Sequence, residues 1–92
     1  MVVKKIYVIV VYDISVERID AVRTFLRRYL NWVQNSVFEG ELTESEMMLV
    51  DAGIKERIDV ETDSVLIYSL KTDKFLDRKE IGAPRASIST II

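Results

Sequence analysis

A single apolar run near the start of the chain constrains the fold more than any other feature. Residues 6–12 are all Ile, Val or Tyr, and the run ends abruptly at Asp13. Because β-branched side chains are stiff and pack well on a pleated surface, the run predicts a central strand over 5–12, buried on both faces. Asp13 would then lie at the carboxyl end of this strand, where such sheets commonly meet a ligand or metal. On spacing alone, Asp13 or Ser15 could equally cap a following helix.

The rest of the chain alternates between helical and extended patterns. Apolar residues at three- and four-residue spacing predict a helix over 16–30, and Thr43-Glu44-Ser45-Glu46 is a capping box that predicts the start of a second helix. The other expected elements are two short strands within 31–42 joined at Asn35-Ser36, a connection at 59–63, a strand at 64–70 and a charged, mobile segment at 71–78. The second helix is expected to carry the apolar residues Met47, Leu49, Val50, Ile54 and Ile58, with Gly53 as a weak point.

The order of these elements predicts the fold class. Strand, helix, two strands, helix and strand make the ferredoxin-like βαββαβ plan, so we expect an α+β sandwich formed by one domain of 92 residues. This plan hosts many unrelated activities and does not identify one. The β-prone residues 87–92 have no place in its four-stranded sheet and would be an exposed aggregation hazard. We therefore expect them to form an additional strand that pairs with another chain.

The composition narrows both the chemistry and the partners. The chain has no Cys and no His, which excludes thiol nucleophiles, Cys/His zinc sites, disulfides and imidazole acid-base catalysis. Any reaction must use carboxylates, hydroxyls, Lys, Arg or a bound hard cation. The net charge of −2 gives little general attraction for nucleic acid, so that role would need a local basic patch. No segment approaches the roughly 20 apolar residues that span a bilayer, so we expect no membrane contact and a cytoplasmic location.

One candidate for a basic patch lies on the first predicted helix. Arg23, Arg27 and Arg28 fall largely on the side away from its apolar stripe. An ordinary solvated surface, with Asp20 paired to Arg23, explains this placement for an isolated helix. The alternative is a surface that faces the phosphates of a nucleic acid, and it requires a second chain or a substrate.

Two blocks of sequence resemble the CRISPR-associated Cas protein 2 family. They are Tyr12-Asp13-Ile14-Ser15, at the end of the first strand, and the segment 33–43, Val-Gln-Asn-Ser-Val-Phe-Glu-Gly-Glu-Leu-Thr. Both blocks lie at the family's order and spacing, and the resemblance covers nearly the whole chain. It implies a ferredoxin-like homodimer in which the two sheets face each other and the C-terminal strands, here 87–92, cross to the partner's sheet.

The resemblance also implies an activity and its residues. Family members are metal-dependent endonucleases that cut RNA, and in some cases duplex DNA, and that take part in spacer acquisition for antiviral defence. The family's catalytic, metal-binding aspartate corresponds to Asp13, with Mg²⁺ or Mn²⁺ as the metal. Tyr12 precedes it as in the family pattern, Phe38 takes the place of a family aromatic residue, and Arg18 is nearest to a family basic residue. Trp32 stands where many members have Arg, which puts a phosphate-binding role at that position in doubt.

The chemistry of Asp13 favours a site shared between two chains. A single carboxylate holds a hard cation poorly, since Mg²⁺ takes six oxygen ligands that usually include one or two carboxylates, waters and a substrate phosphate. A symmetric dimer that brings two copies of Asp13 together would supply the second carboxylate, and a metal between them could orient a water for attack on a phosphodiester. An alternative from another class remains open: an architectural subunit without catalysis, which bridges dimers of the Cas protein 1 integrase on DNA. A small-molecule sensor is a third hypothesis that no ligand-specific motif supports.

Overall fold

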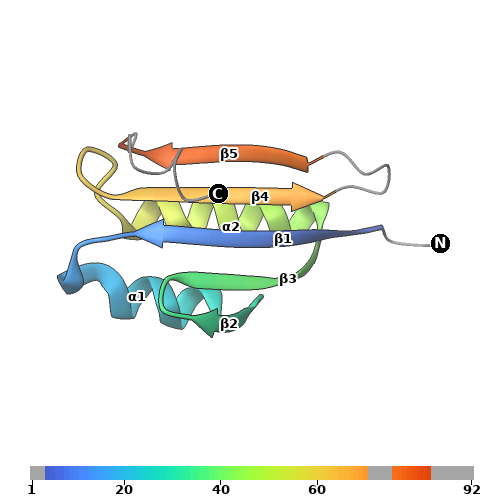
Figure 1. The fold of residues 1–92 in the computed structure, drawn as a ribbon, viewed down its shortest axis with the longest axis horizontal. Coiled ribbons are helices and arrows are strands. Elements are labelled where there is room, and N and C mark those ends of the chain that lie inside the picture. Colours follow the sequence, from blue (N-terminus) through green and yellow to red (C-terminus); the bar gives the residue numbers. More distant parts are fainter. Residues whose placement is uncertain (1–3, 71–75, 84–92) are drawn as a thin grey trace.

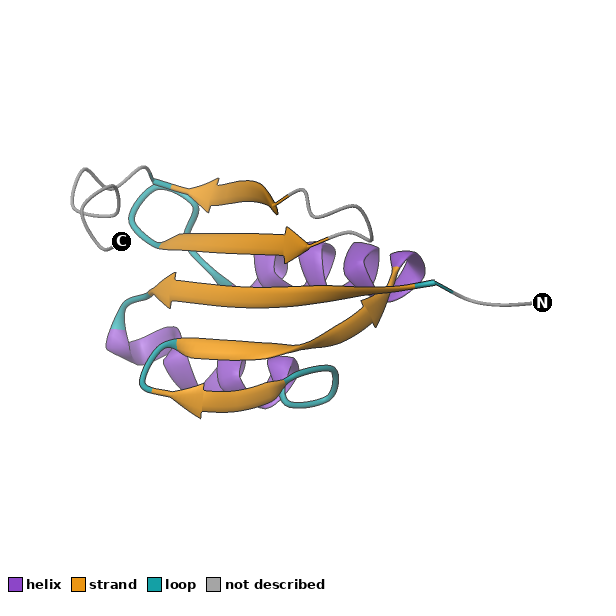
Figure 2. Cartoon of the chain, turned by 45° about the vertical axis from the view of Figure 1, so that its right-hand side comes forward, coloured by secondary structure: helices purple, strands orange, loops and turns teal. Residues whose placement is uncertain are grey.

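The first apolar run forms the central strand of a five-stranded sheet. The computed structural model describes residues 4–70 and 76–83. In it, strand β1 (Lys5–Asp13) pairs in antiparallel fashion with β3 (Val37–Thr43) on one side and β4 (Ser64–Leu70) on the other. The edge strands β2 (Asn31–Gln34) and β5 (Leu76–Gly82) complete the order β2-β3-β1-β4-β5. Helices α1 (Val16–Leu26) and α2 (Glu44–Arg57) both lie behind the sheet in Figure 1 and Figure 2.

This architecture is the expected ferredoxin-like α+β class with a fifth strand added. The first four strands and the two helices follow the βαββαβ plan, and β5 pairs with β4 at the edge of the sheet. Because two layers of secondary structure enclose one core, the sheet has one face against the helices and, within residues 4–70 and 76–83, one face without a helix.

The one-sided cover determines how β1 is buried. Val8 and Tyr12 are at most 3% exposed on the face that the helices cover, whereas Tyr7 on the other face is 37% exposed. The prediction that both faces of this strand are buried is therefore wrong for the described part of the chain, because both helices cross on the same side of the sheet. We use the name open face for the side without a helix, which on β1 carries Tyr7, Ile9, Val11 and Asp13.

Helix α1 ends earlier than the apolar spacing predicted. Its last residue is Leu26, and a turn follows in which the Leu30 N–H donates to the Leu26 carbonyl at 2.8 Å. This turn places Leu30 in the core at 5% exposed and lets the chain reverse into β2. The two short strands that follow are confirmed, and the tight turn between them is made without glycine because Asn35 adopts a φ of +42°.

Helix α2 begins at the predicted capping box. The Thr43 hydroxyl accepts a hydrogen bond from the Glu46 N–H at 3.1 Å, and the Glu46 carboxylate accepts one from the Thr43 N–H at 2.8 Å. Leu49, one of the apolar residues of this helix, is 55% exposed and lies outside the core. Gly53 is a packing position rather than a weak point, because the Phe25 ring of α1 occupies the place that a Cβ atom would take.

The last described segment departs furthest from the sequence prediction. Residues 76–78, expected in a charged and mobile segment, belong to β5, so that prediction is wrong there. The strand is held because Ile81 is buried at 5% exposed and the Lys79 ammonium lies 2.9 Å from the Asp51 carboxylate of α2. The expected exchanged strand at 87–92 lies outside the described residues. Within the described part of the chain, neither helix is long and apolar enough to cross a membrane.

Candidate functional site

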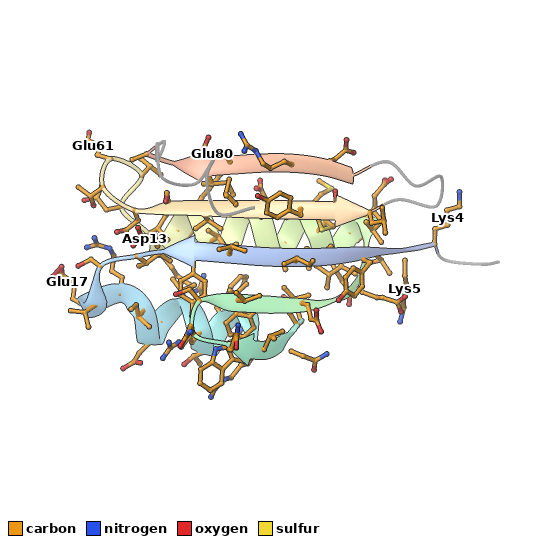
Figure 3. All side chains as sticks on the ribbon, viewed as in Figure 1. Lys4, Lys5, Asp13, Glu17, Glu61 and Glu80 are labelled. Atoms are coloured by element: carbon orange, nitrogen blue, oxygen red, sulfur yellow. The ribbon has the colours of Figure 1, made fainter. Side chains whose placement is uncertain are left out.

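The carboxyl end of β1 places Asp13 at the border of a hollow. Asp13 is the last residue of the strand, its side chain is exposed, and it is paired with Ser64 of β4. Figure 3 shows Asp13 at the arrowhead end of β1, near the start of α1 where Glu17 is labelled. The hollow has a volume of about 460 Å³, and it is lined by Asp13, Ile14, Ser15, Glu17, Arg18, Asp59, Thr62 and Asp63. We call it the Asp13 hollow.

A buried carboxylate that the sequence analysis missed holds one wall of this hollow together. Asp63 is 1% exposed and accepts four hydrogen bonds: from Arg18 Nε at 2.6 Å, from Arg18 Nη2 at 3.0 Å, and from the backbone N–H groups of Ser15 at 3.0 Å and Asp59 at 2.9 Å. The Arg18 guanidinium, helped by the two backbone donors, lowers the pKa of the Asp63 carboxyl well below its usual range, although burial acts in the opposite direction. Asp63 therefore stays ionised and ties the loop after β1 to the loop before β4.

The Asp63 carboxylate also binds groups of Ser15 and Arg18 at the start of α1. Ser15 occupies the N-cap position of α1, but its hydroxyl donates to the Glu17 carboxylate at 2.8 Å and makes no capping bond to the helix. Its backbone N–H is the group that contacts Asp63. Arg18 lies in the first turn of α1 with 27% of its side chain exposed, so it lines the hollow while two of its nitrogens are bound to Asp63. The sequence gives only a weak indication that Asp63 is buried, because in the sequence this residue resembles any polar residue at the end of a connecting loop.

Tyr12 and Phe38 support the site from inside the core. Tyr12 is 3% exposed and Phe38 is fully buried, with 6.1 Å between their ring centroids. The Tyr12 hydroxyl donates to the Asn35 carbonyl at 3.2 Å and accepts from Arg23 Nε at 2.9 Å. These contacts attach the end of β1 to the turn between β2 and β3. The two aromatic residues hold the strand that carries Asp13, and neither is placed to touch a substrate.

The three arginines of the predicted basic patch divide into two groups. Arg23 is half-buried and bound to Tyr12 and, through Nη2 at 3.2 Å, to the Asn35 carbonyl. Its Cζ atom also lies 5.1 Å from the ring centroid of Trp32. Arg27 and Arg28 are exposed, and the Arg27 Cζ atom lies 5.4 Å from the same ring. Arg27 and Arg28 are therefore exposed at the end of α1, whereas Arg23 holds the β2–β3 turn.

The donors around Asp13 limit how one chain could hold a metal. Among the residues that the structure describes, no group of three or more Asp and Glu side chains is arranged to bind a metal ion. Asp63 is already saturated by four donors. Asp13 thus offers one hard oxygen ligand per chain, a set that fits Mg²⁺ or Mn²⁺ if waters, a substrate phosphate or a second copy of the chain complete it.

The comparisons with known proteins agree on one family. The family model described as CRISPR associated protein Cas2 matches residues 6–78. A protein of Methanosarcina acetivorans named CRISPR-associated endoribonuclease Cas2 is 49% identical over 86 residues, which cover 94% of this chain and 99% of that protein. A protein of the same name from Thermococcus kodakarensis is 51% identical, again over 94% of this chain and 99% of the relative.

A solved structure agrees with these relatives in fold. The structure titled "Crystal structure of cas2" superposes on this chain with a TM-score of 0.71 at 42% sequence identity. The match covers 90% of this chain and 93% of the other. At this identity and coverage, the likeness extends to sequence as well as to the arrangement of strands and helices.

Proposed function

Since the chain belongs to the CRISPR-associated Cas2 family, we propose that it acts as an endoribonuclease of CRISPR defence whose cleavage site is built on Asp13. One observation carries the proposal: Asp13 is an exposed carboxylate at the end of the central strand, at the border of a hollow. Its backbone is fixed by pairing with β4 and by the adjoining bond from the Tyr12 N–H to the Ser36 carbonyl at 3.1 Å. A carboxylate whose backbone is fixed in this way is held in one position relative to a bound substrate, as catalysis requires.

The charge in the Asp13 hollow supports a divalent cation as part of the reaction. Among the residues that the structure describes, the hollow is lined by four carboxylates, those of Asp13, Glu17, Asp59 and Asp63, and by one guanidinium, that of Arg18. A phosphodiester would be repelled there unless a cation offset this negative charge. We assign Asp13 as the residue that holds Mg²⁺ or Mn²⁺, and the bound ion would stabilise the charge that develops on the phosphate oxygens. Arg18 remains in place because Asp63 holds it.

The open face of the sheet supports a homodimer. Ile9 and Val11 of β1 are half-buried there, and their cross-strand neighbours Val37 and Tyr68 are half-buried on the same side. A second copy that covers this face would bury apolar surface and would carry its own Asp13 to the same side of the sheet. The proposed dimer thus offers a route to the second carboxylate that one chain lacks.

The test is the substitution Asp13→Asn, which keeps the shape of the side chain and removes its charge. We expect metal-dependent cleavage of single-stranded RNA to fall at least 100-fold, because the ligand for the cation is lost, while the fold is retained. The matched control is Asp20→Asn, which removes the same charge from an exposed position on α1 and should leave cleavage unchanged. The measurement is the cleavage rate of purified protein over a series of Mg²⁺ and Mn²⁺ concentrations.

Two results would contradict parts of the proposal. Undiminished metal-dependent cleavage by Asp13→Asn protein would remove Asp13 from the reaction. No cleavage by the unaltered protein with any metal, pH or RNA substrate would instead favour the architectural role, in which the dimer bridges Cas protein 1 integrase dimers on DNA.

A further inference from the structure

The edge of the molecule formed by the end of α1 and by β2 carries an exposed aromatic ring among arginines. Trp32 is 46% exposed on a strand whose residues are all exposed. We propose that Trp32 is a stacking platform for an unpaired base of the RNA substrate, with Arg27 and Arg28 binding the adjoining phosphates. This inference rests on the proposed function for its ligand, and it adds a binding subsite away from Asp13.

The indole ring of Trp32 is held in a fixed position. Its Nε1–H donates to the Asn35 carbonyl at 3.0 Å, and the same carbonyl accepts from Tyr12 and from Arg23. The polar atom of the ring is therefore satisfied within the protein. A ring that is already ordered loses little conformational freedom when a ligand stacks on it, which favours binding.

The two arginines that contact the ring come from one helix and its end. Arg23 and Arg27 are separated by one helical turn, and their Cζ atoms lie 5.1 and 5.4 Å from the ring centroid. Both side chains approach from α1 and its end, and Trp32 still keeps 46% of its surface exposed. The part of the indole that stays accessible would offer the kind of flat apolar surface on which a nucleic-acid base stacks.

The charge at this edge complements a phosphate backbone, although the chain as a whole carries a net charge of −2. Arg23, Arg27 and Arg28 are clustered at the end of α1, and β2 itself, Asn-Trp-Val-Gln, has no charged side chain. Arg27 and Arg28 are exposed, so both are accessible to phosphates that flank a stacked base. Aromatic stacking next to cationic side chains is the arrangement by which proteins bind single strands.

The distance between Trp32 and Asp13 is compatible with one RNA strand that contacts both residues. Trp32 is paired with Phe38, and Phe38 with Val10, so Trp32 lies two strands away from β1. Asp13 follows Val10 by three residues along β1. With about 3.3 Å per residue and about 4.8 Å between strands, the two Cα atoms are separated by roughly 14 Å. Phe38 and Val10 face the helices, so Trp32 lies on the helix side of the sheet, whereas Asp13 lies on the open face. An RNA single strand that contacts both would therefore pass round the β2–β3 turn, which lies at the same end of the sheet as Asp13.

Trp32 can be tested directly because it is the single tryptophan of the chain. A single-stranded oligouridylate is titrated into Asp13→Asn protein in the presence of chelator, so that binding is measured without cleavage. We expect quenching of the tryptophan fluorescence by the single strand and no quenching by an RNA duplex of equal length, whose bases are already stacked on each other. The absence of quenching by the single strand, or equal quenching by the duplex, would overturn the proposal.

Substitutions give a second, independent measurement. Trp32→Gln should weaken binding of a labelled oligouridylate by about 5- to 150-fold, the range expected when one stacked base loses its aromatic partner. Val33→Gln is the matched control, since Val33 is 49% exposed on the same strand, and it should bind as the unaltered protein does. Trp32→Phe should recover most of the affinity, which separates stacking from a loss of fold. Binding by Trp32→Gln protein equal to that of Val33→Gln protein would refute the subsite.

These results are distinguishable from a failure of the proposed function. If the single strand quenches Trp32 but the unaltered protein cleaves no RNA, the subsite stands and the cleavage proposal fails. If RNA is cleaved through Asp13 but neither binding nor KM changes in Trp32→Gln protein, the cleavage proposal stands and the subsite fails.

Discussion

The substitution Asp63→Asn tests the contact that forms the wall of the Asp13 hollow. It replaces a buried carboxylate that accepts four hydrogen bonds with an amide of nearly the same shape. The amide has one acceptor oxygen, and in either orientation its NH₂ group would face one donor of Arg18 and one backbone N–H, of Ser15 or of Asp59. We therefore expect the loop after β1 to lose its attachment to the loop before β4.

The structure allows the loss of stability to be estimated. Removing one partner of a buried ion pair typically costs about 3–5 kcal/mol, because the other charge is left buried without a partner. The Arg18 side chain is 27% exposed and would regain some contact with water, so the cost should lie at the lower end, about 3 kcal/mol. For a domain of this size, that loss corresponds to a fall in Tm of roughly 12 °C or more.

The stability difference should also depend on pH in a defined direction. The pKa of Asp63 is lowered in the folded protein, so its contribution is fully present above the pKa of an unfolded Asp, about 3.9, and is lost as the pH falls through the folded value. The free energy of unfolding of the unaltered protein and of Asp63→Asn should differ by a constant amount from neutral pH to about pH 5. Below about pH 4 the difference should shrink.

The assay is chemical or thermal unfolding followed by circular dichroism, at one protein concentration and from pH 3 to 7. Asp59→Asn is the matched control, because Asp59 is exposed on the same loop and its side chain accepts a bond from the Glu61 N–H that an amide can also accept. This control should change the free energy of unfolding by less than about 0.5 kcal/mol. If Asp63→Asn were no more destabilising than Asp59→Asn, or if the difference did not depend on pH below 4, the stabilising role of the Arg18–Asp63 pair would be refuted.

Three further substitutions test the backbone conformation, the packing and the helix cap elsewhere in the domain by the same unfolding measurement. Gly82→Ala should cost about 2 kcal/mol or more, since Gly82 has a φ of +95° and a Cβ atom there would collide with the Asp63 carbonyl; a neutral result would contradict the backbone conformation. Gly53→Ala should cost about 1–3 kcal/mol because the Phe25 ring would have to move, and a stabilised variant, as helix propensity alone predicts, would argue against this contact. Thr43→Ala should cost about 1 kcal/mol by removing half of the capping box, with no loss expected if the cap contributes nothing.

The elements that the sequence predicts best are those whose signal is local. The strand at 64–70 coincides with β4, and the capping box marks the start of α2, because apolar runs and side-chain to backbone bonds depend on residues a few positions apart. The apolar run predicted Asp13 at the end of the strand, where the structure places it, and the family resemblance implied its catalytic, metal-binding role. The end of α1 was missed because Leu30 remains in the apolar periodicity although the helix has already stopped.

The parts that escaped prediction depend on contacts between distant residues. Asp63 ends a polar loop, and its burial is favourable because Arg18, 45 residues away in the sequence, and the backbone N–H groups of Ser15 and Asp59 bind its carboxylate. The first three residues of β5, 76–78, were expected to be mobile, yet they belong to a strand that is held because Lys79 is bound to Asp51 of α2 and Ile81 enters the core. Neither partner can be found from the local sequence, because no pattern of spacing links residues so far apart.

The misjudged burial of β1 can be explained by the same alternation that defines the open face. Successive residues of a strand point to opposite sides, so a run that is apolar at every position supplies two apolar surfaces. Val8 and Val10 are fully buried in the core of the described chain, whereas Ile9 and Val11 remain half-buried on the side without a helix. Asp13 belongs to this second surface by the same alternation. A partner that covers the open face would therefore bury the apolar residues on that side of β1 and would also come close to the Asp13 carboxylate. The alternation of residues along β1 thus links the proposed dimer to the proposed metal site.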